Sequence, residues 1–183
     1  TDVNVTYMTD KGPVAHPQNP IRMPANSRKT IRVNDFLPGK DFSTLVEGGH
    51  PIIAERAMYW DNGTGEAGHD SIGMAAPHST FYLPNGGCGQ DGQTYTLVQN
   101  PGASGVTVRV SYLPNGGGTT VAFTDTVPAN SRKTYDMADK GAGQNGASVL
   151  VECLTTGGKI MVERAMYWYN KGAGTDTIGG YSD

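Results

Sequence analysis

The chain has 183 residues and a net charge of −3, so it carries no basic field that would attract nucleic acid or an anionic membrane. Only 17% of the residues are charged and 26 are Gly, which together with many Thr and Val favours an all-β protein rich in turns. No apolar run approaches the roughly 18 residues that a membrane-spanning helix needs. We therefore expect neither a nucleic-acid partner nor a membrane span.

Internal repetition organises the chain. Four segments recur about 105 residues further along, a spacing typical of one small β-domain: Val5–Met8 as Val110–Leu113, Met23–Thr30 as Val127–Thr134, Glu55–Trp60 as Glu163–Trp168, and Asp70–Gly73 as Asp176–Gly179. We predict two tandem units, over residues 1–78 and 79–183.

The first unit is predicted to be truncated. Thr1 falls where the third strand of a complete unit begins, so the strand pair equivalent to Ser79–Gln99 is absent and five strands remain. With no initiator Met at Thr1, we interpret the chain as a fragment or a mature product. The open edges and core of this unit need a cover, from a preceding piece of the parent chain, a neighbouring molecule or the second unit. A linker is expected over Asp61–His78.

The second unit is predicted to contain seven short strands separated by Gly, Pro and Asn turns. They are Ser79–Leu83, Tyr95–Gln99, Val106–Leu113, Thr119–Thr126, Lys133–Met137, Ser148–Leu154 and Lys159–Tyr169. The Gly-rich tail Asn170–Asp183 is expected to be a poor strand. Seven strands at this spacing indicate an immunoglobulin-like sandwich, so the predicted fold is all-β, with two such units and the first lacking its N-terminal strand pair.

The repeated hexapeptide Glu-Arg-Ala-Met-Tyr-Trp places one charge on each face of a strand. Neither face is cleanly polar, so the strand is expected to be central or covered on its outer face, with each charge paired. A Glu precedes the turn into this strand in both units and is a natural partner for the Arg. The candidate structural ion pairs involve Arg56, Glu47, Glu55, Arg164, Glu152 and Glu163. Ligand binding is the alternative, whereas no second acid recurs that would support catalysis.

The aromatic end of the hexapeptide could stack on sugars or cap the core. The residues concerned are Tyr59, Trp60, Tyr167 and Trp168. His69-Asp70-Ser71 has the letters of a hydrolase triad, but adjacent residues cannot converge as such a relay does.

One loop is a weak candidate for binding Ca²⁺. Asp61, Glu66 and Asp70 are oxygen ligands of the right type, but the second unit replaces Asp61 and Glu66 and a solvated turn is favoured. The His and Cys residues lack zinc spacing. We expect no cofactor.

The segments at 79–86, 97–102, 127–132 and 162–168, which contain Asn-Pro-Gly, Pro-Ala-Asn-Ser-Arg and Glu-Arg-Ala-Met-Tyr-Trp, resemble a family of tandem repeats in secreted bacterial proteins. The resemblance implies β-sandwiches outside the cell, often in arrays or attached to enzymes such as cell-wall hydrolases and proteases, with no assigned activity. An extracellular location favours a disulfide between Cys88 and Cys153, with two separate thiols as the alternative.

These observations predict a non-catalytic extracellular structural module, acting as a spacer, stalk or assembly element at a bacterial cell surface. Its partners would be adjacent repeats of the same or another chain. One alternative is a module that binds cell-wall glycans. Another is a filament subunit whose open first unit is completed by strands of another chain.

Overall fold

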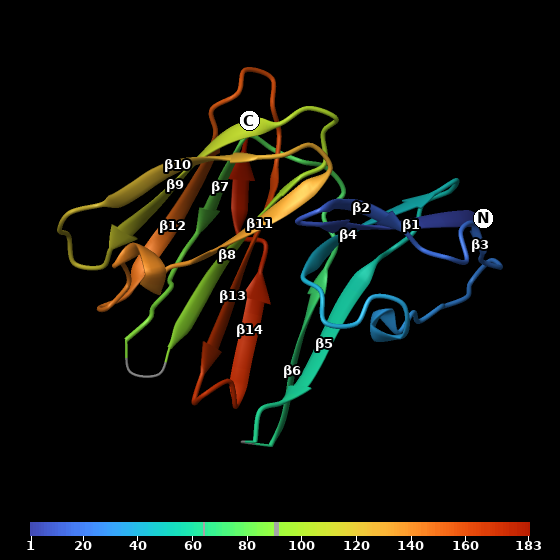
Figure 1. Cartoon of the computed structure of the whole chain (residues 1–183), viewed down its shortest axis with the longest axis horizontal. Coiled ribbons are helices and arrows are strands. Elements are labelled where there is room, and N and C mark those ends of the chain that lie inside the picture. The colour runs from blue at the N-terminus through green and yellow to red at the C-terminus, as the bar shows by residue number, and fades with distance from the viewer. Residues whose placement is uncertain (64, 90–91) are drawn as a thin grey trace.

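The computed structural model describes residues 1–63, 65–89 and 92–183, and it is almost entirely β-structure (Figure 1). Its helices in these ranges are two 3-10 turns, η1 (Val33–Asp35) and η2 (Ala138–Lys140). The all-β prediction is confirmed. Within the same ranges, no helix is long and apolar enough to cross a membrane.

The N-terminal sheet is built around β1 (Asp2–Thr9). β4 (Phe42–Gly48) pairs along one edge of β1, while β2 (Gly12–Ala15) and β3 (Ile21–Arg22) pair along the other. Alternate residues of β1 are buried on one face, and a small hydrophobic cluster forms there. Its buried members are Val3, Val5, Tyr7 and Ile21.

A loop rather than a second sheet covers this cluster. The loop supplies Met23, Ile31, Val33 and Leu37. The strand expected here, equivalent to Lys133–Met137, is not formed, and η1 ends the segment instead. The reason lies in the pairing, because β11 (Ser131–Asp136) of the second half pairs with β8 (Gln93–Asn100), and the first half has no equivalent of β8.

A separate hairpin follows, made of β5 (Glu55–Asp61) and β6 (Glu66–Ile72). β6 lies within the expected linker Asp61–His78, so that prediction is wrong for these residues. The burial of β6 alternates as in a strand, with its odd-numbered residues Ala67, His69 and Ser71 partly covered. Its Gly, Ser and acidic residues have low β-propensity, which hid the strand in the sequence.

The C-terminal half is a β-sandwich. A five-stranded sheet has the order β10-β9-β12-β7-β15, and a four-stranded sheet has the order β11-β8-β13-β14. The remaining bounds are β7 (Thr80–Leu83), β9 (Val106–Pro114), β10 (Val121–Val127), β12 (Ala147–Cys153), β13 (Met161–Trp168), β14 (Ala173–Thr177) and β15 (Gly180–Ser182). The seven predicted strands are all present. The tail prediction is wrong, because Asn170–Asp183 contains β14 and β15, which pair with β13 and β7 through backbone groups that need no particular side chain.

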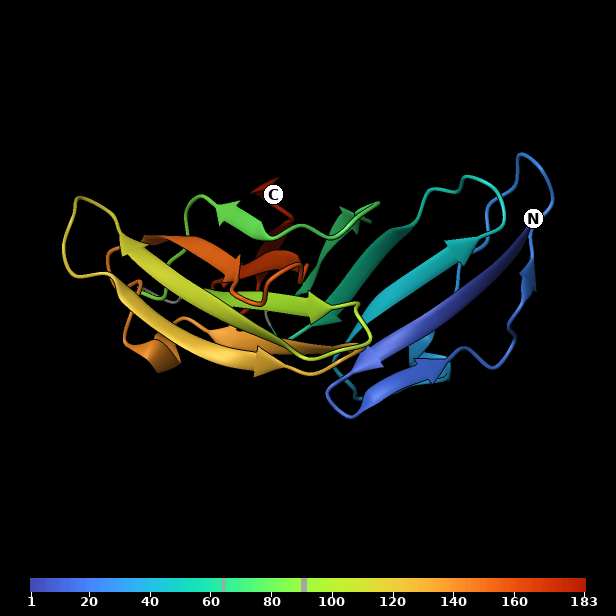
Figure 2. The same ribbon diagram turned by 90° about the horizontal axis from the view of Figure 1, so that it is seen from above.

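The main core lies between these two sheets. Its buried members are Phe81, Leu83, Val98, Val106, Val108, Val110, Tyr112, Val127, Tyr135, Met137, Ala142, Ala147, Val149, Val151, Ile160 and Val162. The N-terminal sheet lies beside the sandwich along the long axis of the molecule, and β5 and β6 lie between them (Figure 2).

The expected disulfide is not formed, and both cysteines are free thiols. The Cys88 backbone N–H donates to Gly143 O, and Ala147 N–H donates to Gly86 O, so Cys88 lies beside the beginning of β12. Cys153 is the last residue of β12. Six residues of strand span about 20 Å, far beyond the Cα separation of roughly 4.4–6.8 Å that a disulfide requires.

Labelling should therefore find two thiols. We expect the denatured chain to take up two maleimides without any reductant, and the count to stay at two after reduction. Mass spectrometry measures the adducts directly. A count of zero that rises to two on reduction would contradict this placement of the cysteines.

Candidate functional site: the interface between two hairpins

The two copies of the hexapeptide lie in two hairpins that match residue for residue. Ala57 pairs with Asp70 in β5–β6, and Ala165 pairs with Asp176 in β13–β14. Tyr59 and Tyr167 likewise each face a Gly, at positions 68 and 174. The same side chains therefore share a face in both hairpins.

In β13 the hexapeptide is a central strand, between β8 and β14, as its mixed faces predicted. Its inner face carries Val162, Arg164 and Met166, which are buried. Its outer face, with the facing residues of β14, forms a surface that we name the β13–β14 outer surface. This surface comprises Glu163, Ala165, Tyr167, Gly174 and Asp176.

The β5–β6 hairpin lies against that surface with one face only. Arg56, Trp60 and His69 share this face, because Met58 pairs with His69 and alternate residues of β5 point the same way. We name these three residues the β5–β6 inner surface. In β13, the corresponding face points into the sandwich core; in the first half no sandwich encloses it, and it packs on the second half.

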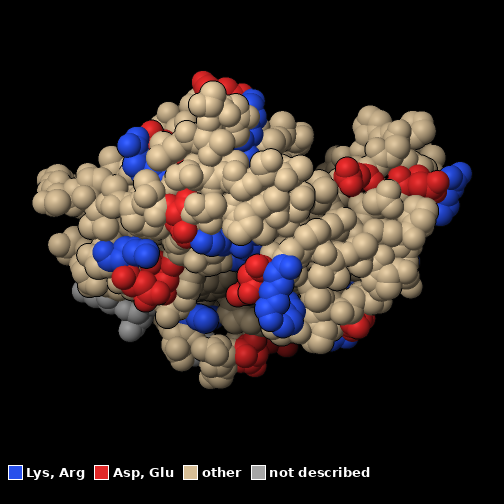
Figure 3. Space-filling view, turned by 45° about the horizontal axis from the view of Figure 1, so that its top comes forward, with Lys and Arg blue, Asp and Glu red and all other residues tan. Residues whose placement is uncertain are grey.

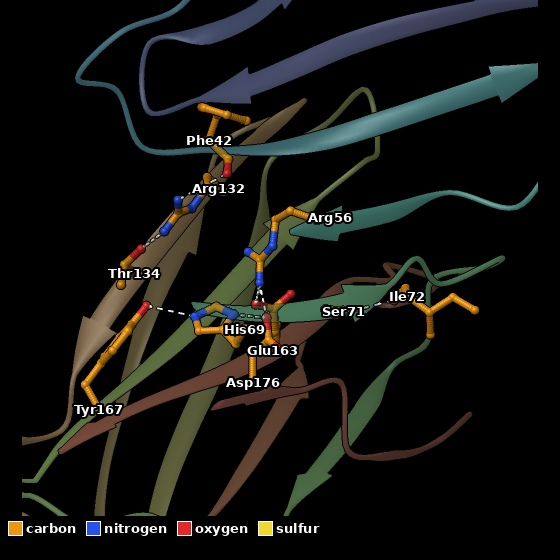
Figure 4. A network of polar contacts seen from close by, with 10 residues as sticks. All are labelled: Phe42, Arg56, His69, Ser71, Ile72, Arg132, Thr134, Glu163, Tyr167 and Asp176. Atoms are coloured by element: carbon orange, nitrogen blue, oxygen red, sulfur yellow. Dashed lines mark hydrogen bonds and ion pairs between the residues drawn. The ribbon is translucent and has the colours of Figure 1, made fainter. Parts of the chain in front are cut away.

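Arg56 forms the centre of the contact (Figure 4). Its Nη2 lies 2.7 Å from Glu163 Oε1 and also donates to Asp176 Oδ2. The Asp176 side chain is only 1% exposed, whereas that of Arg56 is 33% exposed. Burial raises the pKa of Glu163, and the nearby Arg56 guanidinium partly offsets that rise. One guanidinium thus compensates two carboxylates at an interface that excludes most water.

His69 links the same carboxylate to an aromatic group. His69 Nδ1 lies 2.9 Å from Asp176 Oδ2, and His69 Nε2 lies 3.3 Å from the Tyr167 hydroxyl. The His69 side chain is 4% exposed. Burial lowers the pKa of His69, against the opposing effect of Asp176, so its ring is neutral at pH 7. Burial also raises the pKa of Tyr167.

Trp60 supplies the apolar part of the interface. Its ring lies 5.2 Å from that of His69 and 5.4 Å from that of Tyr167, both in edge-to-face geometry. A Cβ added at Gly174 would lie 3.0 Å from Trp60 Cη2, so the absence of a side chain at Gly174 makes room for the indole. The Trp60 indole N–H donates to Lys171 O.

A second contact joins the N-terminal sheet to the sandwich. Arg132 in β11 is 8% exposed, and its guanidinium donates to Phe42 O and to Thr134 Oγ1. Gln99 Nε2 lies 2.9 Å from the sulfur of Met8. The two halves are therefore joined at two separate places: by these contacts, and by the contacts of Arg56 with Glu163 and Asp176.

The structure pairs the charged residues differently from the sequence expectation. Glu152 forms a two-pronged ion pair with Arg109, not with Arg164, and Glu47 makes no ion pair among the described residues. Glu55 is exposed. Val151 points into the core, so its neighbour Glu152 points outward, whereas Arg164 points inward. Arg164 donates instead to the backbone oxygens of Pro84 and Asn85.

The aromatic candidates do not form an exposed platform, although Trp60 and Tyr167 contact each other edge to face within the interface. Trp60 has its ring engaged by His69 and Tyr167, while Tyr59 is 85% exposed on the opposite face of its hairpin. Trp168 is half-buried. No two of these side chains lie side by side as a flat exposed platform in the contacts of the described residues.

The calcium candidates do not converge. Asp61 and Glu66 face each other across the hairpin, but Asp70 lies four residues along β6 from Glu66, a distance of about 13 Å. In the described part of the chain, no group of three or more His, Cys, Asp or Glu side chains could hold a metal ion. Thr64, within the proposed loop, lies outside the described residues.

Sequence reasoning missed three titratable residues that take part in the contacts between the halves: His69, Asp176 and Arg132. His69 was considered only in a hydrolase triad with its neighbours, and its contacts come from another hairpin. Asp176 had a signal, because Asp-x-Ile-Gly occurs at 70–73 and 176–179. The structure places both Asp residues in strands.

The interface is expected to weaken in mild acid through His69. A lowered folded-state pKa means that the unfolded chain binds the proton first, so stability present above about pH 6.5 is lost as the pH falls toward the folded-state value. The raised pKa of Glu163 acts with the opposite sign. Urea denaturation at about pH 7.5 and 5 should show a smaller loss in His69→Gln than in the natural chain. Equal losses would contradict the role of His69, since Glu163 and the other histidines are common to both chains.

No protein-family model matches the sequence, and no curated protein matches it. A solved structure with a similar fold is the crystal structure of Thermotoga maritima 1070. The TM-score is 0.50 at 13% identity, over 58% of this chain and 96% of that chain. At this identity the likeness concerns the fold alone, and it agrees with an all-β, sandwich-like architecture.

Proposed function

We propose that the chain is a non-catalytic structural module of a bacterial extracellular or cell-surface protein, which acts as a spacer or assembly element. In this proposal its halves are two tandem immunoglobulin-like units, the first incomplete. The observation that carries the proposal is the contact of Arg56 with Glu163 and Asp176, because it uses the repeated hexapeptide to fasten one half to the other.

The chemistry of the interface supports a mechanical role. Asp176 and His69 are almost fully covered; Asp176 Oδ2 contacts both Arg56 and His69, and His69 Nε2 lies near the Tyr167 hydroxyl. Asp176 Oδ1 and Arg56 Nε are buried without a hydrogen-bond partner among the described residues. On the face shown in Figure 3, acidic and basic residues are interleaved rather than gathered into one patch, so no single-sign field marks a charged ligand. The extracellular location rests on the resemblance to secreted repeats.

Small-angle X-ray scattering tests the proposal. A spacer whose halves are fastened should scatter as one rigid particle that fits the docked arrangement. A profile that requires a wide range of angles between the two halves would refute a spacer role. The measurement should be repeated at high salt, because buried pairs are screened much less than exposed ones.

Glycan binding can be tested in the same protein. The two Trp residues of the chain are both in the hexapeptides, so intrinsic fluorescence reports on each. We expect no saturable change on titration with soluble peptidoglycan fragments. A saturable change that is lost in Tyr59→Ala would favour glycan binding, since Tyr59 is the most exposed of the aromatic candidates.

A further inference from the structure

The outward face of the β5–β6 hairpin has the same composition as the surface on which that hairpin sits. It carries Glu55, Ala57, Tyr59, Gly68 and Asp70, which we name the β5–β6 outer surface. The β13–β14 outer surface carries Glu163, Ala165, Tyr167, Gly174 and Asp176. All five residue types recur, and the cross-strand pairs Ala–Asp and Tyr–Gly are in the same register.

The two surfaces differ in whether they are covered. On the β13–β14 surface, Asp176 is 1% exposed beneath Arg56 and His69. On the β5–β6 outer surface, Glu55, Ala57 and Asp70 are exposed and Tyr59 is 85% exposed. Ile53 and Ile72, 87% and 61% exposed, extend its apolar area. Two carboxylates and several apolar side chains therefore lie together without a cover in the described structure.

The space for an indole is also repeated. Gly174 has Trp60 directly above it. At Gly68, the three nearest atoms to an added Cβ all belong to Met58 and Tyr59 of the same hairpin. A Trp from another hairpin can thus lie over Gly68 as Trp60 lies over Gly174, with an Arg from that hairpin reaching Glu55 and Asp70.

We propose that the β5–β6 outer surface binds the β5–β6 inner surface of a second copy of this chain. Arg56, Trp60 and His69 of that copy would meet Glu55, Tyr59, Gly68 and Asp70 as they meet the matching residues within one chain. The proposal deepens the proposed function and rests on its assembly role. The contact is head-to-tail, so each bound hairpin offers the same outer surface again, and open stacks can grow.

The intramolecular contact competes with this association. Within one chain the inner surface has an effective local concentration of about millimolar for its own β13–β14 surface, so the natural chain should be largely monomeric below that range. E163Q/D176N removes both carboxylates from that surface and makes the inner surface available. Sedimentation velocity should show the weight-average mass of E163Q/D176N rising about twofold or more between roughly 10 μM and 1 mM.

The matched control carries the same substitutions on the other hairpin. E55Q/D70N should stay monomeric, and E163Q/D176N/E55Q/D70N should lose the association, although its inner surface is equally free. Amide exchange of β9 and β12 checks that the sandwich is folded in each variant. Association that persists in the quadruple variant would reveal non-specific aggregation and overturn the proposal, as would an E163Q/D176N chain that stays monomeric. Neither result touches the docking within one chain, which scattering tests separately.

Discussion

Replacement of Arg56 by Met is expected to lower the free energy of unfolding by about 3–5 kcal/mol, the cost typical of removing one partner from a buried ion pair. Arg56 itself is one-third exposed, but the carboxylates that it compensates are covered, and Asp176 is 1% exposed. Without the guanidinium, Glu163 and Asp176 repel each other in a site with little water. Urea denaturation followed by circular dichroism measures the change.

Two comparisons isolate this effect. Arg109→Met removes an Arg that also pairs with a carboxylate, but Arg109 is 46% exposed, so we expect a loss below about 1 kcal/mol. In an E163Q/D176N background, Arg56→Met should cost far less than in the natural chain, because no carboxylate is left without a partner. Similar losses for Arg56→Met and Arg109→Met would show that the hairpin interface is not a buried contact.

The strands of the second half could be predicted because their apolar residues alternate between turn residues. β9 is an example, since Val106, Val108 and Val110 are buried while Thr107 and Arg109 between them are exposed. β6 and β14 could not be predicted in this way. They contain Gly, Ser, Thr and Asp, and they are strands because they pair with β5 and β13.

The sequence predicted that the charged residues of the hexapeptide need partners, but not which residues those partners are. Alternation predicted that its two charges point to opposite faces and that each needs a partner. It did not reveal that Arg56 meets residues more than 100 positions away, because that depends on a hairpin whose inner face has no sandwich around it. The Cys88–Cys153 prediction was wrong for a related reason, since residue counts do not tell which end of a strand each sulfur occupies.

A second large loss in the free energy of unfolding is expected from a substitution in the core of the sandwich. Phe81 in β7 is 0% exposed and lies among the side chains of both sheets. Phe81→Ala leaves a cavity that the surrounding strands fill only in part, so we expect a loss of about 3–5 kcal/mol in the free energy of unfolding. Tyr82→Ala is the matched control. Its side chain is 50% exposed on the other face of the same strand, and we expect a loss below about 1 kcal/mol.

Phe81→Ala should also weaken a part of the molecule that Phe81 does not touch. A two-stranded hairpin is marginally stable by itself, and β5–β6 pairs with no other strand among the described residues. The β5–β6 hairpin therefore stays folded only while its inner surface can pack on a folded β13–β14. Hydrogen exchange should show the amides of β5–β6 losing protection in Phe81→Ala together with those of β13, whereas Arg56→Met should release β5–β6 and leave β13 protected. If β5–β6 stayed protected while the sandwich opened, the N-terminal sheet would be what stabilises the hairpin. The contact of the β5–β6 inner surface with the β13–β14 outer surface would then not be needed for its folding.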